Sequence, residues 1–331
     1  MSRDLLQEIA DVMRAEWNIA IAGSRPIRRG YMNEKWMLQT NAGPLFVKSY
    51  HPERYRKHQE TVWREIGQAL RLQAAFRQAG GACPALLEAG GQRLLHRTAS
   101  GRMFVVMTGC PGRMVPAGKA TPEQMRSLGA AAAFMHAVWN DGNLAAAAEE
   151  RPAQPLWTVD LPGLMKQWEQ RQEEAVGAPA ATLQALQLQR SIIGRLVPGE
   201  WADECPGWTH LDLWADNLLF EADKLTAIVD FDRVRYSHPM LDLGRAVLSL
   251  TLDRGAFRRE AAAALAEGYR QIRPLAKGRL LHAVRHAWVV ESFWWIRPGM
   301  DRFSTAPHRF AREMLWTAGQ WDELEHVLGN I

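Results

Sequence analysis

The sequence predicts an α+β protein with two lobes: a small amino-terminal lobe with a β-sheet and a helix, and a larger, mainly helical carboxy-terminal lobe. In residues 25–50, short strand-like segments alternate with turn signals, and a long helical pattern follows them. After about residue 112 the helical pattern dominates. Hydrophobic residues make up 47% of the 331-residue chain, which is enough for two buried cores. We therefore expect one lobe in residues 1–110 and the other in residues 111–331.

The amino-terminal lobe is expected to contain two helices and two hairpins. Helical periodicity covers residues 4–17 and 58–79, and Gly80-Gly81 ends the second helix. The segments KWMLQT and PLFVKSY are typical of strands and are joined by the turn NAG. A second pair, QRLLHRT and RMFVVMT, is joined by ASG. This order predicts a small antiparallel sheet accompanied by helices.

The carboxy-terminal lobe is expected to be a set of helices with one β-like insertion. Thr121-Pro122 is typical of a helix start, with Thr as the N-cap and Pro at the first position. The insertion covers residues 216–232, where two apolar runs flank a polar turn. Further helices are expected near residues 160–176, 180–197, 241–253, 257–272, 277–297 and 307–328.

Composition and charge exclude several classes of protein. The net charge is only +4 and the sequence shows no stripe of lysines and arginines, so we expect no nucleic-acid partner. The three cysteines are far apart, which argues against a disulfide framework or a zinc site. There is no apolar window of about 18 residues, and acidic residues interrupt the first 11 positions. We therefore expect no membrane span and a cytoplasmic location; the oligomeric state stays open.

The densest group of chemically active side chains lies in the segments THLDLWADNLLF and AIVDFD. Phosphoryl transfer requires a carboxylate that receives or orients the acceptor hydroxyl, and oxygen ligands that hold Mg²⁺ on the nucleotide phosphates. Asp212 and Asn217 are five positions apart in one loop, and Asp230 follows a turn between two short strands. The spacing therefore predicts a phosphoryl-transfer site with Asn217 and Asp230 beside one metal ion.

The same residues resemble the signature of the aminoglycoside phosphotransferase-like family, which has a protein-kinase-like fold and includes choline kinases, homoserine kinases and spore-coat CotS-type proteins. The resemblance rests on His210-x-Asp212-x-x-x-x-Asn217, on VDFD at residues 229–232, and on HPMLDLGRA, which contains Asp242. It implies that Asp212 is the catalytic aspartate, that Asn217 and Asp230 are Mg²⁺ ligands, and that His210 and Asp242 are structural. Many members have Gly where this chain has Leu211, which we interpret as a mark of a subfamily.

The family resemblance also implies a nucleotide site in the amino-terminal lobe. Lys48, on a predicted strand, would contact the ATP phosphates and pair with an acidic residue of the next helix, either Glu65, which we favour, or Glu60. The segment RRGYMNEKWML resembles the family's phosphate-covering turn and places Gly30 and Asn33 there. In the expected hinge, Met107 would lie behind the adenine, and backbone groups of Thr108 and Cys110 would contact its edge.

The family resemblance also implies that the phosphate acceptor is a small hydroxyl compound. We expect an ATP- and Mg²⁺-dependent transfer to the hydroxyl of a small molecule such as homoserine or choline, with an antibiotic ranked lower because the sequence shows no acidic cluster in this region. The alternative is a CotS-like binding or structural protein with little or no turnover. The candidate acceptor residues combine aromatic, acidic and basic side chains: Asp232, Glu291, Trp294, Trp295 and Arg297.

Overall fold

The computed structural model describes residues 3–28, 33–55, 59–142, 151–201 and 204–331. The chain forms two compact units. Unit 1 comprises Met1–Gly112 and Thr226–Arg233, and unit 2 comprises Arg113–Leu225 and Val234–Ile331. The sequence analysis expects two consecutive lobes and does not include a segment that returns to unit 1. In the structure, Thr226–Arg233 returns to unit 1, and this segment carries Asp230 and Asp232.

Unit 1 is built on a five-stranded antiparallel sheet with the strand order β1-β2-β3-β5-β4. The predicted hairpin around NAG is confirmed by the pairing of Thr40 with Gly43. The segment QRLLHRT, in contrast, contributes only two strand residues, so the predicted length of that strand is wrong. The elements are α1 (Arg3–Trp17), β1 (Ile21–Pro26), β2 (Glu34–Thr40), β3 (Gly43–Ser49), the 3₁₀ turn η1 (Pro52–Tyr55), α2 (Gln59–Gln78), β4 (His96–Arg97) and β5 (Met103–Thr108).

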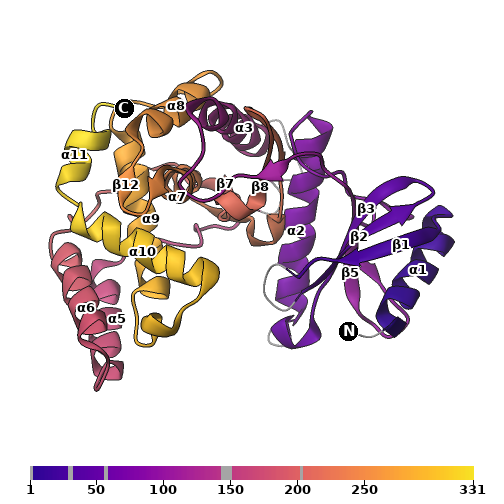
Figure 1. Ribbon diagram of the computed structural model, residues 1–331, viewed down its shortest axis with the longest axis horizontal. Helices are drawn as coiled ribbons and strands as arrows, with labels where there is room; N and C mark the ends of the chain where they lie inside the picture. The colour runs from indigo at the N-terminus through magenta and orange to yellow at the C-terminus, as the bar shows by residue number, and fades with distance from the viewer. Residues whose placement is uncertain (1–2, 29–32, 56–58, 143–150, 202–203) are drawn as a thin grey trace. The chain divides into compact units, whose positions relative to one another are not determined.

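The two faces of this sheet bury different clusters of side chains. Successive residues of a strand point to opposite faces. Accordingly, Leu45 and Val47 of β3 pack with α1 residues in one core, whereas Tyr50, just after β3, packs with Ile66 of α2 in the other. Figure 1 shows α1 and α2 on opposite faces of the sheet. This alternation places Lys48 on the α2 face, two residues before Tyr50.

The return segment of unit 1 is anchored beside α2. The Ile228 N–H donates to the Ala82 carbonyl oxygen at 2.8 Å. Phe231 is buried, and its ring centroid lies 6.5 Å from that of Phe76 in α2. Asp230 and Asp232 flank this buried phenylalanine, at the start of the 3₁₀ turn η3 (Phe231–Arg233). The anchor therefore fixes the backbone from which both carboxylates project.

Unit 2 is mainly helical, as predicted. Thr121 caps α3 with a full capping box, in which its side chain accepts from the Gln124 N–H and the Gln124 side chain accepts from the Thr121 N–H. The helices are α3 (Pro122–Asn140), α5 (Leu161–Glu174), α6 (Ala180–Ile193), α7 (Met240–Thr251), α8 (Arg259–Arg270), α9 (Arg279–Trp295), α10 (Thr305–Gly319) and α11 (Glu323–Leu328). The single helix predicted over residues 307–328 is therefore two helices, because the chain turns after Gly319.

Short strands accompany these helices. The predicted β-like insertion is confirmed as β8 (Leu218–Glu221) and β9 (Lys224–Ile228), in a sheet with the order β6-β8-β9 that includes β6 (Arg113–Met114). Two further pairs contradict the expectation of one β insertion. They are β7 (Gly207–Thr209) with β10 (Arg235–Ser237), and β11 (Leu252–Asp253) with β12 (Ala256–Phe257). These strands have two or three residues each, too few for a recognisable alternating pattern.

None of the helices in the described part of the chain combines the length and the apolar composition that a membrane span requires.

Helices α3 and α8 pack closely because glycines lie at their crossing. A Cβ atom added to Gly268 would lie 2.0 Å from the Arg126 carbonyl oxygen, and one added to Gly129 would lie 2.1 Å from the Leu265 carbonyl oxygen. Both contacts are with backbone atoms, which have little freedom to move. The close approach also lets Tyr269 of α8 reach His136 of α3.

Replacement of Gly268 by Ala is expected to destabilise unit 2 by ~1–3 kcal/mol, because the added methyl group forces two packed helices apart. The matched control is Gly319→Ala, where the added Cβ meets nothing within 4 Å and the change is expected to be neutral or stabilising by a few tenths of a kcal/mol. Urea unfolding followed by circular dichroism measures both. Equal stability of the two variants would contradict the close crossing.

Candidate functional site

The loop that carries Asp212 is held by the carboxylate of Asp242. The loop follows β7, and the backbone N–H groups of His210 and Leu211 donate to Asp242 Oδ2 and Oδ1 at 2.8 and 2.7 Å. Asp242 lies in the first turn of α7 and is fully buried. Two charge-assisted hydrogen bonds to consecutive N–H groups fix the direction of the chain one residue before Asp212.

Leu211 adopts a left-handed backbone conformation with φ of 62°. This conformation costs a residue with a Cβ atom roughly 1–2 kcal/mol, and glycine adopts it freely. The requirement explains why glycine is common at this position in the family that the sequence resembles. In this chain the hydrogen bond to Asp242 and the packing of the Leu211 side chain against Leu241 and Ala287 offset the strain.

Asp242 is itself supported by a buried pair that the sequence prediction did not assign to the site. His136 Nε2 lies 3.0 Å from Asp242 Oδ2, and His136 Nδ1 lies 3.1 Å from the hydroxyl of Tyr269. A carboxylate only accepts, so Nε2 carries a proton and donates to Asp242. Burial raises the pKa of Tyr269 to about 12, so its hydroxyl stays protonated at neutral pH. The sequence around His136 contains no pattern that indicates its contact with Asp242.

Asn217 and Asp212 are joined directly. The Asn217 amide nitrogen donates to the Asp212 backbone carbonyl and to Asp212 Oδ2, both at 3.0 Å. Both residues are buried. Because the amide nitrogen makes both hydrogen bonds, the amide oxygen points away from Asp212 and keeps its capacity as an acceptor. A carboxylate and an amide oxygen are thus held with fixed orientations in one loop.

Unit 1 contains the second group of predicted residues, centred on Lys48. Its ammonium nitrogen lies 2.5 Å from Asp230 Oδ1 and 2.6 Å from Asp232 Oδ2. Lys48 is only 4% exposed. Burial lowers the pKa of Lys48, but the charges of Asp230 and Asp232 raise it by more, so its pKa lies above the ordinary value and the side chain is charged. Lys35 lies 3.9 Å from Asp230 Oδ2.

Asp230, like Leu211, has a left-handed backbone, with φ of 65°. Such a conformation is uncommon for a residue other than glycine and is maintained only where the surroundings over-determine it. The buried Phe231 supplies that constraint on one side.

The predicted acidic partners of Lys48 differ in exposure, since Glu65 of α2 is half-buried and Glu60 is exposed. The pairing of Lys48 with either glutamate stays a prediction.

The phosphate-covering turn predicted from the sequence contains Gly30 and Asn33, and the structure describes Asn33. Asn33 is buried, donates to the Tyr55 hydroxyl at 2.9 Å and accepts from the His51 N–H at 3.1 Å. Gly30 lies outside the described residues.

The predicted hinge residues follow each other at the end of β5. Met107 receives a weak contact from the Gln73 amide at 3.6 Å, and the Thr108 N–H donates to the Ala85 carbonyl at 2.9 Å. Cys110 is half-buried, and burial raises the pKa of its thiol.

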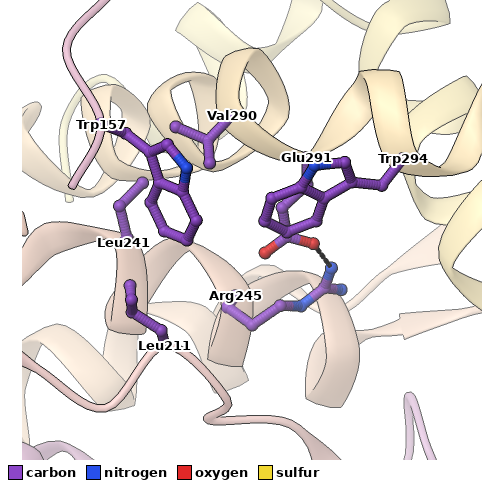
Figure 2. A pocket seen from close by; sticks show the side chains of 7 residues that line it. All are labelled: Trp157, Leu211, Leu241, Arg245, Val290, Glu291 and Trp294. Atoms are coloured by element: carbon purple, nitrogen blue, oxygen red, sulfur yellow. Dashed lines mark hydrogen bonds and ion pairs between the residues drawn. The ribbon is translucent and has the colours of Figure 1, made fainter. Parts of the chain in front are cut away.

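A pocket lies in unit 2 beside the loop of Asp212 (Figure 2). The space in this pocket that can hold a water-sized sphere is about 10 Å³, which is enough for about one water molecule. The pocket is lined by Trp157, Leu211, Leu241, Arg245, Val290, Glu291 and Trp294.

The chemistry of this pocket is both aromatic and charged. The rings of Trp157 and Trp294 lie 5.4 Å apart and form an apolar wall. Figure 2 shows the carboxylate of Glu291 directed toward Arg245, and Arg245 Nη1 donates to Glu291 Oε2 at 2.7 Å. Two predicted acceptor residues, Glu291 and Trp294, thus line the pocket. Trp157 and Arg245 were missed by the sequence prediction.

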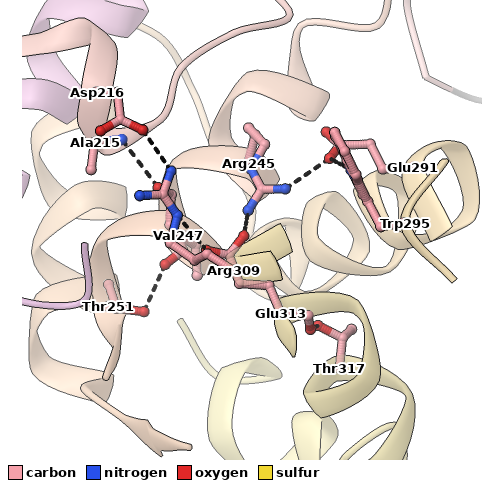
Figure 3. A network of polar contacts seen from close by, with 11 residues as sticks. Ala215, Asp216, Arg245, Val247, Thr251, Glu291, Trp295, Arg309, Glu313 and Thr317 are labelled. Carbon is pink, nitrogen blue, oxygen red and sulfur yellow. Dashed lines mark hydrogen bonds and ion pairs between the residues drawn. The ribbon is translucent and has the colours of Figure 1, made fainter. Parts of the chain in front are cut away.

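A chain of ion pairs runs from this pocket to the loop of Asn217 (Figure 3). Arg245 pairs with the buried Glu313 as well as with Glu291. Arg309 Nε lies 3.5 Å from Glu313 Oε1, and Arg309 Nη2 donates to Asp216 Oδ2 at 2.8 Å. Helix α10 supplies Arg309 and Glu313 and thereby connects this pocket with Asp216, the residue that precedes Asn217.

The remaining predicted acceptor residues lie elsewhere. Trp295 packs near Phe310, with ring centroids 4.9 Å apart, and its indole N–H lies 3.4 Å from Glu291 Oε2. Arg297 is exposed and lies over the ring of Phe303 at 5.3 Å. Asp232 belongs to unit 1.

The chain as a whole has counterparts among known proteins. A family profile described as the phosphotransferase enzyme family, APH, matches residues 23–275, which is most of the chain. The protein belongs to this phosphotransferase family. The family resemblance predicted from the sequence is therefore confirmed, and the protein is a small-molecule phosphotransferase that acts on a hydroxyl group.

Curated relatives of this phosphotransferase include homoserine kinases. One from Methylobacterium radiotolerans (strain ATCC 27329 / DSM 1819 / JCM 2831 / NBRC 15690 / NCIMB 10815 / 0-1) is 29% identical over 276 residues, which cover 81% of this chain and 78% of the relative. Another, from Rhizobium rhizogenes (strain K84 / ATCC BAA-868), is 25% identical over 258 residues, 77% of this chain and 73% of the relative.

Solved structures show that the phosphotransferase has a kinase-like fold, as predicted. An amicoumacin kinase superposes with a TM-score of 0.65 at 14% identity, covering 97% of this chain and 96% of that chain. A spectinomycin phosphotransferase superposes with a TM-score of 0.61 at 12% identity, covering 97% and 98%. At these identities the likeness concerns the fold and leaves the acceptor open.

Proposed function

We propose that this phosphotransferase transfers the γ-phosphoryl group of ATP, with Mg²⁺, to the hydroxyl of a small amino-acid-like alcohol, and that homoserine is the first acceptor to test. The observation that carries this proposal is the pocket of unit 2. Its wall includes Leu211, the residue before Asp212, so a ligand in the pocket lies next to the segment that carries the proposed catalytic carboxylate.

Asp212 is proposed as the residue that orients the acceptor hydroxyl and accepts its proton. The hydrogen bond from Asn217 to Asp212 Oδ2 fixes the orientation of this carboxylate. Asp242 and His136 hold the backbone of this loop. Phosphoryl transfer depends mainly on positioning and on charge stabilisation, so a loop fixed by buried hydrogen bonds suits the reaction.

The donor set also fits Mg²⁺. Asn217 offers an amide oxygen, and Asp230 offers a carboxylate that is 30% exposed in its side chain. Both are hard oxygen ligands of the kind that Mg²⁺ prefers. When bound, Mg²⁺ neutralises charge on the nucleotide phosphates. We propose Lys48 as the cation for the α- and β-phosphates, Asn33 and Gly30 as part of the turn that covers them, and Met107, Thr108 and Cys110 as the adenine contacts.

The pocket supports an acceptor that carries charge. Glu291 and Arg245 place a negative and a positive group 2.7 Å apart at its wall. Since Arg245 also pairs with Glu313, the wall favours an ammonium group at Glu291 and at the indole faces of Trp157 and Trp294. The homoserine kinases among the relatives fit this chemistry.

The proposal is tested by measuring ADP release with Mg·ATP in the presence of homoserine, choline, methylthioribose, an aminoglycoside or a macrolide. We expect homoserine to stimulate ADP release most strongly, and EDTA to abolish the stimulation. Strong stimulation by another compound, with none by homoserine, would contradict homoserine as the acceptor and would leave the proposed kinase activity intact. No stimulation by any compound, together with no binding of Mg·ATP, would refute the proposed ATP chemistry.

A further inference from the structure

We propose that Asp232 and Tyr50 form a fixed anionic seat for Lys48, so that Lys48 keeps a buried partner when Asp230 turns to the metal ion. Asp232 is then a positioning residue for the nucleotide lysine rather than an acceptor residue. This inference rests on the proposed use of Mg·ATP. It concerns residues of unit 1 only.

Both oxygens of Asp232 are engaged by this seat. Oδ2 lies 2.6 Å from the Lys48 ammonium nitrogen, and Oδ1 accepts from the Tyr50 hydroxyl at 3.1 Å. Lys48 also lies over the Tyr50 ring, 5.6 Å from its centroid. The carboxylate therefore joins a cation to a phenol, and each partner limits where the other can move.

Tyr50 is itself held rigidly. It is 1% exposed, and its ring contacts those of Tyr55 and Trp63, with centroids 5.5 and 5.7 Å away. Because Tyr50 follows Lys48 by two residues in an extended segment, the two side chains point to the same face of the sheet. The rigid Tyr50 hydroxyl therefore positions the Asp232 carboxylate, and this carboxylate in turn positions Lys48.

Asp230 differs from Asp232 in ways that suit a mobile carboxylate. Its side chain is 30% exposed, compared with 16% for Asp232. Its partners include Lys48 at 2.5 Å and Lys35 at 3.9 Å. The exposed carboxylate can exchange lysine for a metal ion with less reorganisation of the core.

Charge balance makes the seat necessary. Two lysines and two aspartates form this cluster, so their formal charges cancel. If Asp230 binds a divalent metal, Lys48 loses one partner while it remains 95% or more buried in its side chain. An unpaired buried ammonium is strongly unfavourable. Asp232 removes this penalty and keeps the ammonium directed toward the phosphates.

The test uses calorimetry with the non-hydrolysable nucleotide AMP-PNP. One series measures the affinity for AMP-PNP at saturating Mg²⁺, and a second series measures how AMP-PNP binding depends on the Mg²⁺ concentration. The variants are Asp232→Asn, Tyr50→Phe and the double variant. The control is Asp11→Asn, which changes an exposed carboxylate of α1 that accepts a hydrogen bond from the Gln7 side chain. We expect Asp232→Asn to weaken Mg·AMP-PNP binding ~10-fold and Tyr50→Phe ~3-fold. The double variant should bind no more weakly than Asp232→Asn, because Tyr50 is proposed to act on Lys48 only through Asp232. The Mg²⁺ concentration for half-saturation should stay unchanged.

Two results would overturn the inference while leaving ATP chemistry intact. One is an Asp232→Asn variant that binds normally at saturating Mg²⁺ but requires ~10-fold more Mg²⁺, since that is the behaviour of a metal ligand. The other is an affinity indistinguishable from that of Asp11→Asn. If Asp232→Asn does not fold, Asp232→Glu and Tyr50→Phe decide the question by the same criteria. Failure of the unmutated protein to bind Mg·AMP-PNP would instead refute the proposed function.

Discussion

Replacement of Asp212 by Asn is expected to lower kcat by ~10²–10⁴-fold, the range attributed to a positioned acid–base group. Asn preserves the shape of the side chain and can still accept the hydrogen bond that Asn217 donates to Oδ2. It no longer accepts a proton from the acceptor hydroxyl. The loss should therefore appear in the chemical step, and the affinity for Mg·AMP-PNP should stay within about twofold of the unmutated value.

The control for this variant is Asp223→Asn, which changes an exposed carboxylate that accepts from the Thr121 hydroxyl. Steady-state ADP release with the best acceptor measures both variants, and circular dichroism checks that Asp212→Asn is folded. A kcat within threefold of the unmutated protein would exclude Asp212 as the residue that activates the hydroxyl, because the loss would fall short of an acid–base contribution.

The largest effect on stability is expected for Arg245→Met. Arg245 is 2% exposed and pairs with Glu313, which is 3% exposed. Removal of one partner of a buried ion pair leaves the other charge uncompensated and typically costs ~3–5 kcal/mol. Arg309 remains 3.5 Å from Glu313, so we expect the lower part of this range. Urea unfolding measures the loss.

Two further variants separate the ionic contribution from packing. Adding Glu313→Gln to Arg245→Met should recover part of the stability, because it removes the unpaired charge. Arg195→Met is the matched surface control: Arg195 pairs with Asp322, but both side chains are at least half exposed, and such pairs are worth ~0–1 kcal/mol. Equal losses for Arg245→Met and Arg195→Met would show that the buried chain of ion pairs in Figure 3 does not stabilise unit 2.

The sequence predicts well those parts of the protein whose signals are local. The capping box at Thr121 and the hairpin around NAG depend on a few neighbouring residues, and the structure contains both. The spacing of Asp212 and Asn217 is also local, and the two side chains are hydrogen-bonded. The contact of Lys48 with Asp230 and Asp232 is not local, since 182 residues separate Lys48 from Asp230. The sequence prediction did not contain this contact, because it paired Lys48 with Glu65 or Glu60.

The parts that escaped prediction depend on contacts between distant segments. Arg245, Glu291 and Glu313 come from three helices, α7, α9 and α10, and only packing brings their charges together. Trp157 lies in a segment without helical or strand periodicity, yet its ring reaches Trp294. The partnership of His136 with Asp242 requires α3 and α7 to be placed first. No spacing rule within one segment contains this information.

Leu211 shows how a departure from a pattern acquires a physical meaning. The sequence alone indicates only that leucine replaces a common glycine. The φ of 62° explains the preference for glycine, and the Asp242 carboxylate with the surrounding apolar side chains explains how leucine is accommodated. The same side chain lines the proposed acceptor pocket, so the substitution gives this chain an apolar group beside Asp212 that glycine does not supply.

The most direct test of the account is the identity of the phosphorylated product. Phosphorus NMR of the purified protein with Mg·ATP and homoserine distinguishes a phosphate ester from inorganic phosphate. We predict stoichiometric formation of ADP and a phosphomonoester of the acceptor hydroxyl, and loss of the ester signal in Asp212→Asn. Formation of ADP with inorganic phosphate alone, for homoserine and for every other hydroxyl compound in the panel, would contradict the central claim that the pocket beside Asp212 binds the phosphoryl acceptor.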